Sequence, residues 1–248
     1  MKKLGLIGKT LGHSFSKKYY LEKFERENIR DIDYDLYELS AIEKFKELYE
    51  SEPQLAGVNI TIPYKEEALA YMDELSPEAN EIRAINCVRI ARNDGEIKLK
   101  GFNTDAYGFE ESFKKQLLPS HKKALILGNG GATKAVIYVL NKLGIDFLIV
   151  SRKESADSIT YAELSPELMK EHQIIINCSP VGTYPLIDAS PDIPYEFISD
   201  QHYLYDLIYN PEETLFLRTG REKGAVTKNG LDMLILQAEK NWEIWNQE

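Results

Sequence analysis

The stretch Gly128-Asn129-Gly130-Gly131-Ala132-Thr133 decides how this chain is interpreted. It stands between an apolar run, residues 124–127, and a stretch with the residue pattern of a helix. A strand that leads into a glycine-rich turn and then a helix gathers backbone N–H groups and the helix N-terminus at one point, where a pyrophosphate binds. The sequence therefore predicts a dinucleotide site that begins about halfway along the chain.

Short glycine patterns also occur in ordinary loops, and Thr133 stands at the third glycine position, so a plain loop is the alternative. The neighbouring residues favour the dinucleotide site. Gly144 has the place of a helix C-cap, and residues 145–150 read as a second strand. We therefore expect a strand, a turn, a helix and a second strand in succession.

The residues after that second strand are Ser151, Arg152 and Lys153. An NAD site usually has an acidic residue here to accept the ribose 2′-OH, whereas a 2′-phosphate favours Arg. The triplet predicts NADP as the cofactor, and a solvated basic loop is the alternative. A kinase-type phosphate loop is excluded, because no Gly-Lys-Ser or Gly-Lys-Thr closes the turn.

The 248 residues suffice for two domains of ordinary size. The formal net charge of −10 argues against non-specific binding of nucleic acid. Cys87 and Cys178 form no pairing pattern, and the sequence shows neither a membrane-spanning run nor a signal-peptide pattern. We expect a cytoplasmic protein that binds neither nucleic acid nor membranes and contains no metal.

Short apolar strands alternate with amphipathic helices, which is typical of an α/β protein with parallel sheets. We expect an N-terminal α/β substrate domain over residues 1–105 and a Rossmann-like NADP domain over residues 106–230. The helix in 231–248 is expected to complete the first domain, although its periodicity fits packing on either one. The expected strands are 4–7, 32–39, 55–60, 86–91, 124–127, 145–150, 174–177 and 204–207, and the expected helices are 17–27, 42–49, 64–72, 165–171, 214–222 and 231–245.

The segment Asn59-Ile60-Thr61-Ile62-Pro63-Tyr64-Lys65 is the richest in chemistry in the first half. It reads as the end of a strand, after which Pro63 opens a helix with Lys65 in its first turn. A cation is disfavoured at that end of a helix dipole, so we expect this ammonium to give up its proton readily. Lys65 is therefore a candidate general acid and base, and a solvated lysine is the alternative.

Three other segments are ordinary when taken alone. Gly12-His13-Ser14-Phe15-Ser16 places two hydroxyls on one loop, Ile85-Asn86 places an amide at the start of a strand, and Asn103-Thr104-Asp105 places a carboxylate just before a helix. Turn formation and helix capping explain each of them equally well. Their order along the chain is what makes them informative.

In this order and spacing the segments resemble the shikimate dehydrogenase family over almost the whole chain. The second half continues the resemblance with the glycine turn and with Ile176-Asn177-Cys178-Ser179-Pro180-Val181-Gly182, Tyr205-Asp206-Leu207-Ile208-Tyr209-Asn210-Pro211, Asn229-Gly230-Leu231-Asp232-Met233-Leu234 and Gln237-Ala238. The resemblance implies a substrate domain and an NADP domain with a cleft between them. It also implies reversible, NADP-linked reduction of 3-dehydroshikimate to shikimate, a step of aromatic amino-acid (chorismate) biosynthesis.

The resemblance also implies roles for individual residues. Lys65 is the general acid and base, with Asp105 as its partner. Substrate binding falls to Ser14, Ser16, Thr61, Asn86, Tyr209 and Gln237. Cofactor binding falls to Gly128, Asn129, Gly130, Gly131, Ala132, Ser151, Arg152, Lys153, Ser179, Leu207 and Gly230. The sequence does not distinguish a monomer from a homodimer.

Two other functions remain as alternatives. A quinate/shikimate dehydrogenase with relaxed cofactor use carries nearly the same motifs. A non-catalytic NADP-binding sensor is the more remote alternative, because such a protein does not need Lys65 and Asp105, and both are present.

Overall fold

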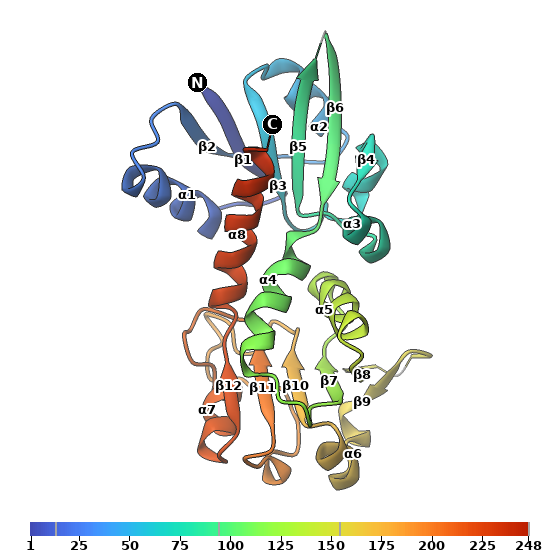
Figure 1. Ribbon diagram of the computed structural model, residues 1–248. Coiled ribbons are helices and arrows are strands. Elements are labelled where there is room, and N and C mark those ends of the chain that lie inside the picture. The colour runs from blue at the N-terminus through green and yellow to red at the C-terminus, as the bar shows by residue number, and fades with distance from the viewer. Residues whose placement is uncertain (13, 94, 154, 248) are drawn as a thin grey trace. The chain divides into compact units, whose positions relative to one another are not determined.

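The structure, a computed structural model, describes residues 1–12, 14–93, 95–153 and 155–247, so His13 of the Gly12–Ser16 segment lies outside it. Its contacts divide the chain into two compact units (Figure 1). Unit 1 comprises Met1–Thr104 and Ala238–Glu248, and unit 2 comprises Asp105–Gln237. The chain passes between the units within two helices, α4 (Thr104–Phe113) and α8 (Leu231–Trp245).

Unit 1 is built on a mixed sheet with the strand order β2-β1-β3-β5-β6-β4. Its further elements are β1 (Lys2–Gly8), α1 (Phe15–Arg26), β2 (Ile32–Glu38), α2 (Lys44–Ser51), β3 (Leu55–Ile60), the 3₁₀ helix η1 (Glu67–Tyr71), β4 (Glu74–Leu75), α3 (Pro77–Ile82), β5 (Cys87–Asn93) and β6 (Glu96–Phe102). Strands β1, β2 and β3 are parallel, whereas β5 runs antiparallel to both β3 and β6. The expected parallel pairing holds for β1, β2 and β3, and the hairpin of β5 and β6 adds the antiparallel part of this sheet.

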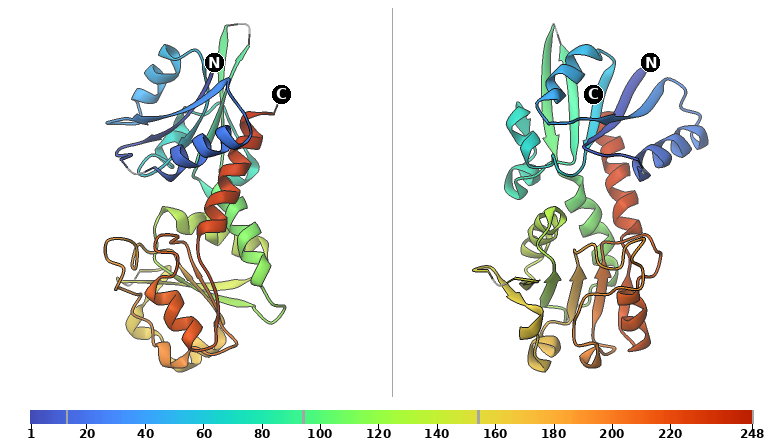
Figure 2. Two further views of the ribbon diagram at one scale, coloured as in Figure 1. Left: turned by 90° about the vertical axis from the view of Figure 1, so that its left-hand side faces the viewer. Right: turned by 180° about the vertical axis from the view of Figure 1, so that it is seen from behind.

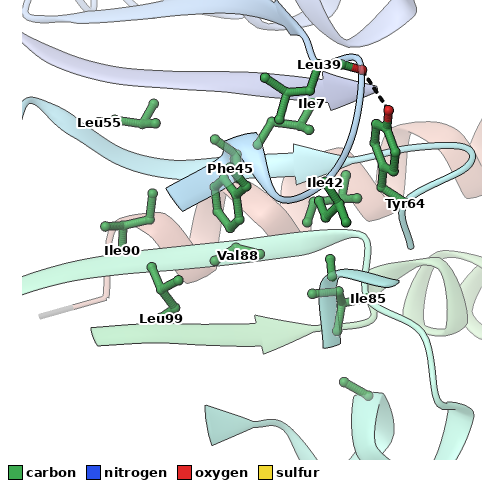
Figure 3. Close-up of a cluster of buried hydrophobic side chains, with 14 residues drawn as sticks. Ile7, Leu39, Ile42, Phe45, Leu55, Tyr64, Ile85, Val88, Ile90 and Leu99 are labelled. Atoms are coloured by element: carbon green, nitrogen blue, oxygen red, sulfur yellow. Dashed lines mark hydrogen bonds between the residues drawn. The ribbon is translucent and has the colours of Figure 1, made fainter. Parts of the chain in front are cut away.

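Apolar side chains cover both faces of the unit 1 sheet. One face packs around Phe45 of α2 and residues such as Val88 and Ile85 (Figure 3). The other face packs against α1 and the C-terminal part of α8, including Tyr20 and Trp245. Figure 2 shows α2 on one side of this sheet and α1 with α8 on the other. The two apolar layers fix where the polar ends of the strands lie.

Unit 2 contains a parallel sheet with the strand order β12-β11-β10-β7-β8-β9. Its elements are α4, η2 (Lys114–Gln116), β7 (Lys123–Leu127), α5 (Gly131–Lys142), β8 (Asp146–Ser151), β9 (Ser158–Thr160), η3 (Tyr161–Glu163), α6 (Pro166–Glu171), β10 (Ile174–Asn177), η4 (Tyr195–Phe197), β11 (Tyr203–Asp206), α7 (Leu215–Glu222), β12 (Val226–Lys228) and α8. This is the doubly wound order of dinucleotide-binding folds, with the reversal of strand order between β7 and β10. The predicted α/β class with a Rossmann-like half is confirmed.

Helices cover both faces of the unit 2 sheet. On one face, Phe113 of α4 stacks on Tyr203 of β11, with ring centroids 5.3 Å apart. On the other face, Leu204 of the same strand joins the apolar cluster that contains Phe216 of α7. Successive residues of β11 therefore point to opposite faces, as a strand requires. Both faces of the sheet are therefore buried, which leaves the ends of its strands for the contacts with a ligand.

The helix expected over residues 64–72 is wrong, because η1 begins only at Glu67 and Lys65 lies in the preceding turn. The carbonyl of Lys65, which an α-helix would use to accept from residue 69, accepts the N–H of Ile85 at 2.8 Å. The N–H of Leu69 donates to Glu66 instead, which is the shorter spacing of a 3₁₀ turn. Lys65 therefore has no α-helix dipole to act on its ammonium.

Within the described ranges, no helix combines the length and the apolar composition needed to cross a membrane.

Candidate functional site

The polar residues of unit 1 gather at one edge of its sheet. Strands β1 and β3 are parallel and end side by side, with Ile7 opposite Ile60. The hairpin brings the start of β5 and the end of β6 to the same edge, where Cys87 lies opposite Asn59 and Phe102. The segments that follow β1 and β3, precede β5 and follow β6 therefore all emerge together.

The ends of β1 and β3 approach closely. The Thr61 N–H donates to the carbonyl of Ile7 at 2.9 Å. A Cβ added at Gly8 would lie 2.7 Å from Cγ2 of Thr61, so a side chain at Gly8 would displace Thr61. Ser14, beyond Gly8, is the N-cap of α1, and its hydroxyl accepts from the N–H of Lys17 at 3.3 Å. Ser16 follows in the first turn of the same helix and hydrogen-bonds the buried hydroxyl of Tyr34.

Lys65 and Asn86 are brought together by the main chain. The hydrogen bond from Ile85 to the carbonyl of Lys65 places Asn86 directly after the residue that holds Lys65. The Asn86 side chain is 3% exposed, and its Oδ1 accepts the Thr104 N–H at 2.7 Å. The structure thus gathers Ser14, Thr61, Lys65 and Asn86 at one sheet edge.

Asp105 and Gln237 belong to unit 2, where α4 and α8 pack against each other. A Cβ at Gly108 of α4 would lie 2.4 Å from the carbonyl of Met233 and 3.1 Å from Cβ of Gln237, so the absence of a side chain permits this approach. Asp105 lies in the first turn of α4, not before the helix as the sequence pattern predicted. The two polar residues therefore stand on neighbouring helices.

The glycine turn lies at the point where the strand order of unit 2 reverses. Gly128 follows β7, and Ser179 lies just after β10. A Cβ added to Gly128 would lie 3.1 Å from the backbone nitrogen of Ser179. Gly128 also has φ +106, a conformation that favours glycine. Ligands of doubly wound sheets bind outside the carboxyl ends of the strands at such a reversal. The turn predicted from the sequence therefore lies at the strand-order reversal, where sheets of this kind bind their ligands.

Gly130 and Gly131 have no packing reason to be glycine. Gly130 caps α5 with φ −97, and an added Cβ at either residue meets nothing within 4 Å. The Thr133 hydroxyl folds back, accepting from the Gly130 N–H and donating to the carbonyl of Gly128, both at 3.1 Å. Thr133 at the third glycine position therefore leaves the turn open. The open space over two glycines at a helix N-terminus fits the pyrophosphate of a dinucleotide.

The end of β8 carries hydroxyl and basic groups. The Ser151 hydroxyl donates to the carbonyl of Lys153 and lies 3.0 Å from the hydroxyl of Ser158. Arg152 and Lys153 are exposed. The position at which an NAD site accepts the ribose 2′-OH with a carboxylate is Ser151 here, which fits a 2′-phosphate better.

A buried carboxylate organises the neighbouring strand ends. Asp206 ends β11, is fully buried, and accepts from Asn177 Nδ2 at 3.0 Å and from the Thr214 hydroxyl at 2.6 Å. Oδ1 of Asn177 accepts from the N–H and the hydroxyl of Ser179, at 3.0 and 2.7 Å. Burial raises the pKa of Asp206 to about 6. The residues beside the strand-order reversal are thus fixed by one hydrogen-bonded group.

Leu207 and Gly230 meet at the main chain. A Cβ at Gly230 would lie 2.1 Å from the carbonyl of Leu207, and the Gly230 N–H donates to Ile208 at 3.0 Å. Tyr209 follows and is 38% exposed. Partial burial raises the pKa of its phenol, so the hydroxyl remains a donor at neutral pH. Sequence motifs assigned no role to Asp206 or Thr104, although a carboxylate that ends an apolar strand is a signal for the former.

The first half of the chain matches a family model described as "Shikimate dehydrogenase substrate binding domain", over residues 6–88. The whole chain is similar to a curated shikimate dehydrogenase (NADP(+)) of Caldicellulosiruptor saccharolyticus. The two are 37% identical, and the alignment covers 99% of this chain and 92% of the relative. The chain belongs to the shikimate dehydrogenase family.

Solved structures agree with this membership. Shikimate 5-dehydrogenase from Thermus thermophilus, solved with NADP(H) and shikimate, is 31% identical with a TM-score of 0.84, and the match covers 99% of this chain and 94% of that one. Shikimate 5-dehydrogenase from Listeria monocytogenes, solved with shikimate and NAD, is 26% identical with a TM-score of 0.86, covering 100% and 92%. The family resemblance found in the sequence is confirmed.

Proposed function

We propose that this protein catalyses the reversible, NADP-dependent reduction of 3-dehydroshikimate to shikimate. The observation that carries the proposal is the sheet edge of unit 1, where the hydrogen bond from Ile85 to Lys65 brings a lysine beside a buried amide, Asn86. A cation and hydrogen-bonding groups at one edge suit a polyhydroxylated acid whose ketone must be protonated as it is reduced.

The bound nicotinamide supplies the hydride, or accepts it in the reverse direction. Lys65 supplies the proton that the carbonyl oxygen needs when the alcohol forms, and takes it back when the alcohol is oxidised. Asp105 supports Lys65 in this role. The substrate carboxylate binds at the hydroxyls of Ser14 and Ser16, helped by Tyr209.

The other assignments complete the site. The ring hydroxyls bind at Thr61, Asn86, Asp105 and Gln237. In unit 2, the pyrophosphate binds at the Gly128–Ala132 turn and the 2′-phosphate at Ser151, Arg152 and Lys153. Ser179, Leu207 and Gly230 contact the nicotinamide. Main-chain N–H groups hold the pyrophosphate and hydroxyls hold the substrate carboxylate, so these two anions are bound by the geometry of neutral donors rather than by cationic side chains.

Unit 1 with α8 completing it is the substrate domain in this proposal, and unit 2 is the NADP domain. We also propose a cytoplasmic location, which the two free cysteines support, since reducing compartments keep thiols reduced. For the assembly, a monomer or a homodimer fits the proposal, and light scattering of the purified chain distinguishes them.

The test is a spectrophotometric assay of reduced nicotinamide with shikimate and quinate, each with NADP and NAD. The proposal expects the highest kcat/KM for shikimate with NADP. Comparable values for quinate, or for NAD, favour the quinate/shikimate dehydrogenase alternative. Binding of NADP without turnover of either acid favours the non-catalytic sensor and contradicts the proposal.

A further inference from the structure

The amide of Asn86 has one orientation fixed by its neighbours. Its Oδ1 accepts the Thr104 N–H at 2.7 Å, and its Nδ2 donates to the Thr104 hydroxyl at 3.0 Å. A backbone N–H can only donate, so the atom that faces it must be the amide oxygen. Thr104 therefore determines which end of Asn86 is donor and which is acceptor.

The Thr104 hydroxyl is oriented in turn by α8. It donates to Oδ1 of Asn241 at 2.6 Å, its shortest hydrogen bond, and it also lies 3.1 Å from Oδ1 of Asn86. A hydroxyl has a single proton, so donating it to Asn241 leaves the oxygen of Thr104 to accept from Asn86. Without Asn241, the hydroxyl proton of Thr104 would turn to Oδ1 of Asn86. There it would compete with the Thr104 N–H, which donates to the same oxygen.

Asn241 is anchored at its other end. Its side chain is fully buried and hydrogen-bonds the hydroxyl of Tyr20. The Tyr20 hydroxyl donates to the carbonyl of Ala238 at 2.8 Å. A carbonyl can only accept, so Tyr20 accepts from Nδ2 of Asn241, and Oδ1 of Asn241 is the end that faces Thr104. The hydrogen bonds run in one direction from Ala238 to Asn86, entirely within unit 1.

The main chain of Asn86 is fixed as well. Its carbonyl accepts from the Ile60 N–H at 2.9 Å and from Nδ2 of Asn59 at 3.1 Å. Oδ1 of Asn59 accepts from the Tyr34 hydroxyl at 2.8 Å. Because the backbone is fixed, the network through Thr104 acts on the direction of the Asn86 side chain.

We propose that Asn241 is a positioning residue, which sets through Thr104 the direction in which Asn86 presents its amide to a hydroxyl of the substrate ring. The role rests on the proposed function. An Asn86 amide that is reversed, or that populates both orientations, offers a substrate hydroxyl the wrong partner or the wrong angle. Binding of the hydroxy acid is then weakened, whereas binding of the dinucleotide is not. No residue of this chain of hydrogen bonds beyond Asn86 needs to touch the substrate.

The first variant is Asn241→Leu, which keeps the side-chain size and removes both hydrogen bonds. It should raise KM for shikimate about tenfold and leave KM for NADP within about twofold, the effect of one misdirected hydrogen bond. The matched control is Ile244→Ala, which removes a buried side chain from the same helix outside the network. It should lower thermal stability without raising KM for shikimate.

The second pair of variants changes Thr104, the residue that links Asn241 to Asn86. Thr104→Val should raise KM for shikimate as Asn241→Leu does, whereas Thr104→Ser keeps the hydroxyl and should retain the wild-type KM. The double variant Asn241→Leu/Thr104→Val should be no worse than either single one, because both act along one path. The two Thr104 variants test the positioning role even if Asn241→Leu does not fold.

The proposal is overturned when Asn241→Leu keeps the wild-type KM for shikimate, or when Ile244→Ala raises this KM equally. It is also overturned when Thr104→Val and Thr104→Ser have the same KM for shikimate. A double variant whose increase in KM is the product of the two single increases overturns it as well. Wild-type protein is assayed first. If it turns over no shikimate, the proposed function fails and the positioning role falls with it. If wild type is active and the variants are unchanged, only the positioning role fails.

Discussion

Lys65 is held in place by its main chain, because its carbonyl accepts the Ile85 N–H at 2.8 Å. Removing the side chain leaves that bond intact, so the turn and the neighbouring Asn86 should keep their positions. The effect of a Lys65 variant therefore reports on the ammonium rather than on the fold.

Lys65→Ala should lower kcat by roughly 10²- to 10⁴-fold, the usual contribution of a general acid. Binding of shikimate and of NADP should stay close to the wild type in equilibrium titrations. Lys18→Ala, which removes an exposed lysine of the same unit, is the control. A near-normal kcat for Lys65→Ala would remove Lys65 from the mechanism.

Arg152 is exposed and follows β8, and the proposed function assigns it to the 2′-phosphate of NADP. Arg152→Ala should weaken binding of NADP roughly ten- to a hundredfold, as for a lost hydrogen bond to a charged group, with little change for NAD. Fluorescence titration with each dinucleotide measures this, and Arg218→Ala, an exposed arginine on α7, is the control. Equal losses for both dinucleotides would contradict the role of Arg152.

At the residue scale, the sequence nominated Lys65 from the pattern of its own segment, and Asn86 only from the order of the segments along the chain. It could not nominate Thr104 or Asn241 as partners, since the hydrogen bond between them joins residues 137 positions apart. A contact of that separation exists only in the folded molecule, and neither residue looks unusual in its own segment.

The glycine turn leaves an open space at the start of the helix that follows it. Packing within the protein does not require this space. Gly130→Ala should lower the unfolding free energy by about 1 kcal/mol or less, as for alanine at an N-cap, and should weaken NADP binding at least about tenfold. Gly230→Ala, where the Cβ would meet the carbonyl of Leu207 at 2.1 Å, should destabilise the protein far more. Thermal unfolding and NADP titration of the two variants separate binding from folding, and normal NADP affinity for Gly130→Ala would refute the role of the open turn.

Asp206 joins the ends of β10 and β11 to the start of α7, and its burial gives the joint a pH dependence. Its pKa rises from the ordinary 3.8 to about 6 in the folded protein. Between these values the folded state binds the proton that the unfolded state releases, so this group's contribution to stability falls as pH rises from about 4 to 6. The full effect is on the order of 3 kcal/mol.

Urea unfolding of wild type and Asp206→Asn at several pH values isolates this contribution. The unfolding free energy of wild type minus that of the variant should fall between about pH 4 and pH 7, because the variant has no proton to release. Other titrating groups cancel in the difference. A difference independent of pH would show that Asp206 titrates normally.

At the element scale, periodicity placed 55–60, 174–177 and 231–245 as the structure has them, because these segments are long or strongly apolar. The cap signal of Gly144 was equally informative, because this residue has φ +65 and lies just beyond the end of α5. Periodicity missed β6, whose Lys98 and Lys100 alternate with apolar residues, and it assigned a helix at Lys65 because the competing donor, Ile85, comes from a distant segment.

For the whole molecule, sequence periodicity left open which unit the last helix completes. The contacts give residues from Ala238 onwards to unit 1. Trp245 fills the space over Gly57, where a Cβ would lie 2.3 Å from the indole ring, and its Nε1 donates to the Val88 carbonyl at 3.0 Å. A partner glycine 188 positions earlier gives no signal in a local window.

Trp245→Ala should lower the unfolding free energy by about 3–5 kcal/mol, as for other buried aromatic residues. Trp242→Ala, on the same helix and only partly buried, should cost less. Hydrogen exchange should show lost protection concentrated in residues 1–104. Protection lost equally in 105–237 would contradict the assignment of Trp245 to unit 1.

The return of Trp245 to the sheet of unit 1 has a consequence for biosynthesis. A ribosome that has released β1 to β6 must translate all of unit 2 before the indole arrives, a delay of roughly ten seconds at ordinary elongation rates. During that interval the sheet of unit 1 exposes the apolar surface around Gly57 that the indole later covers. Chaperones bind surfaces of this kind. Unit 1 therefore completes its folding only after unit 2 and the segment that contains Trp245 have been translated.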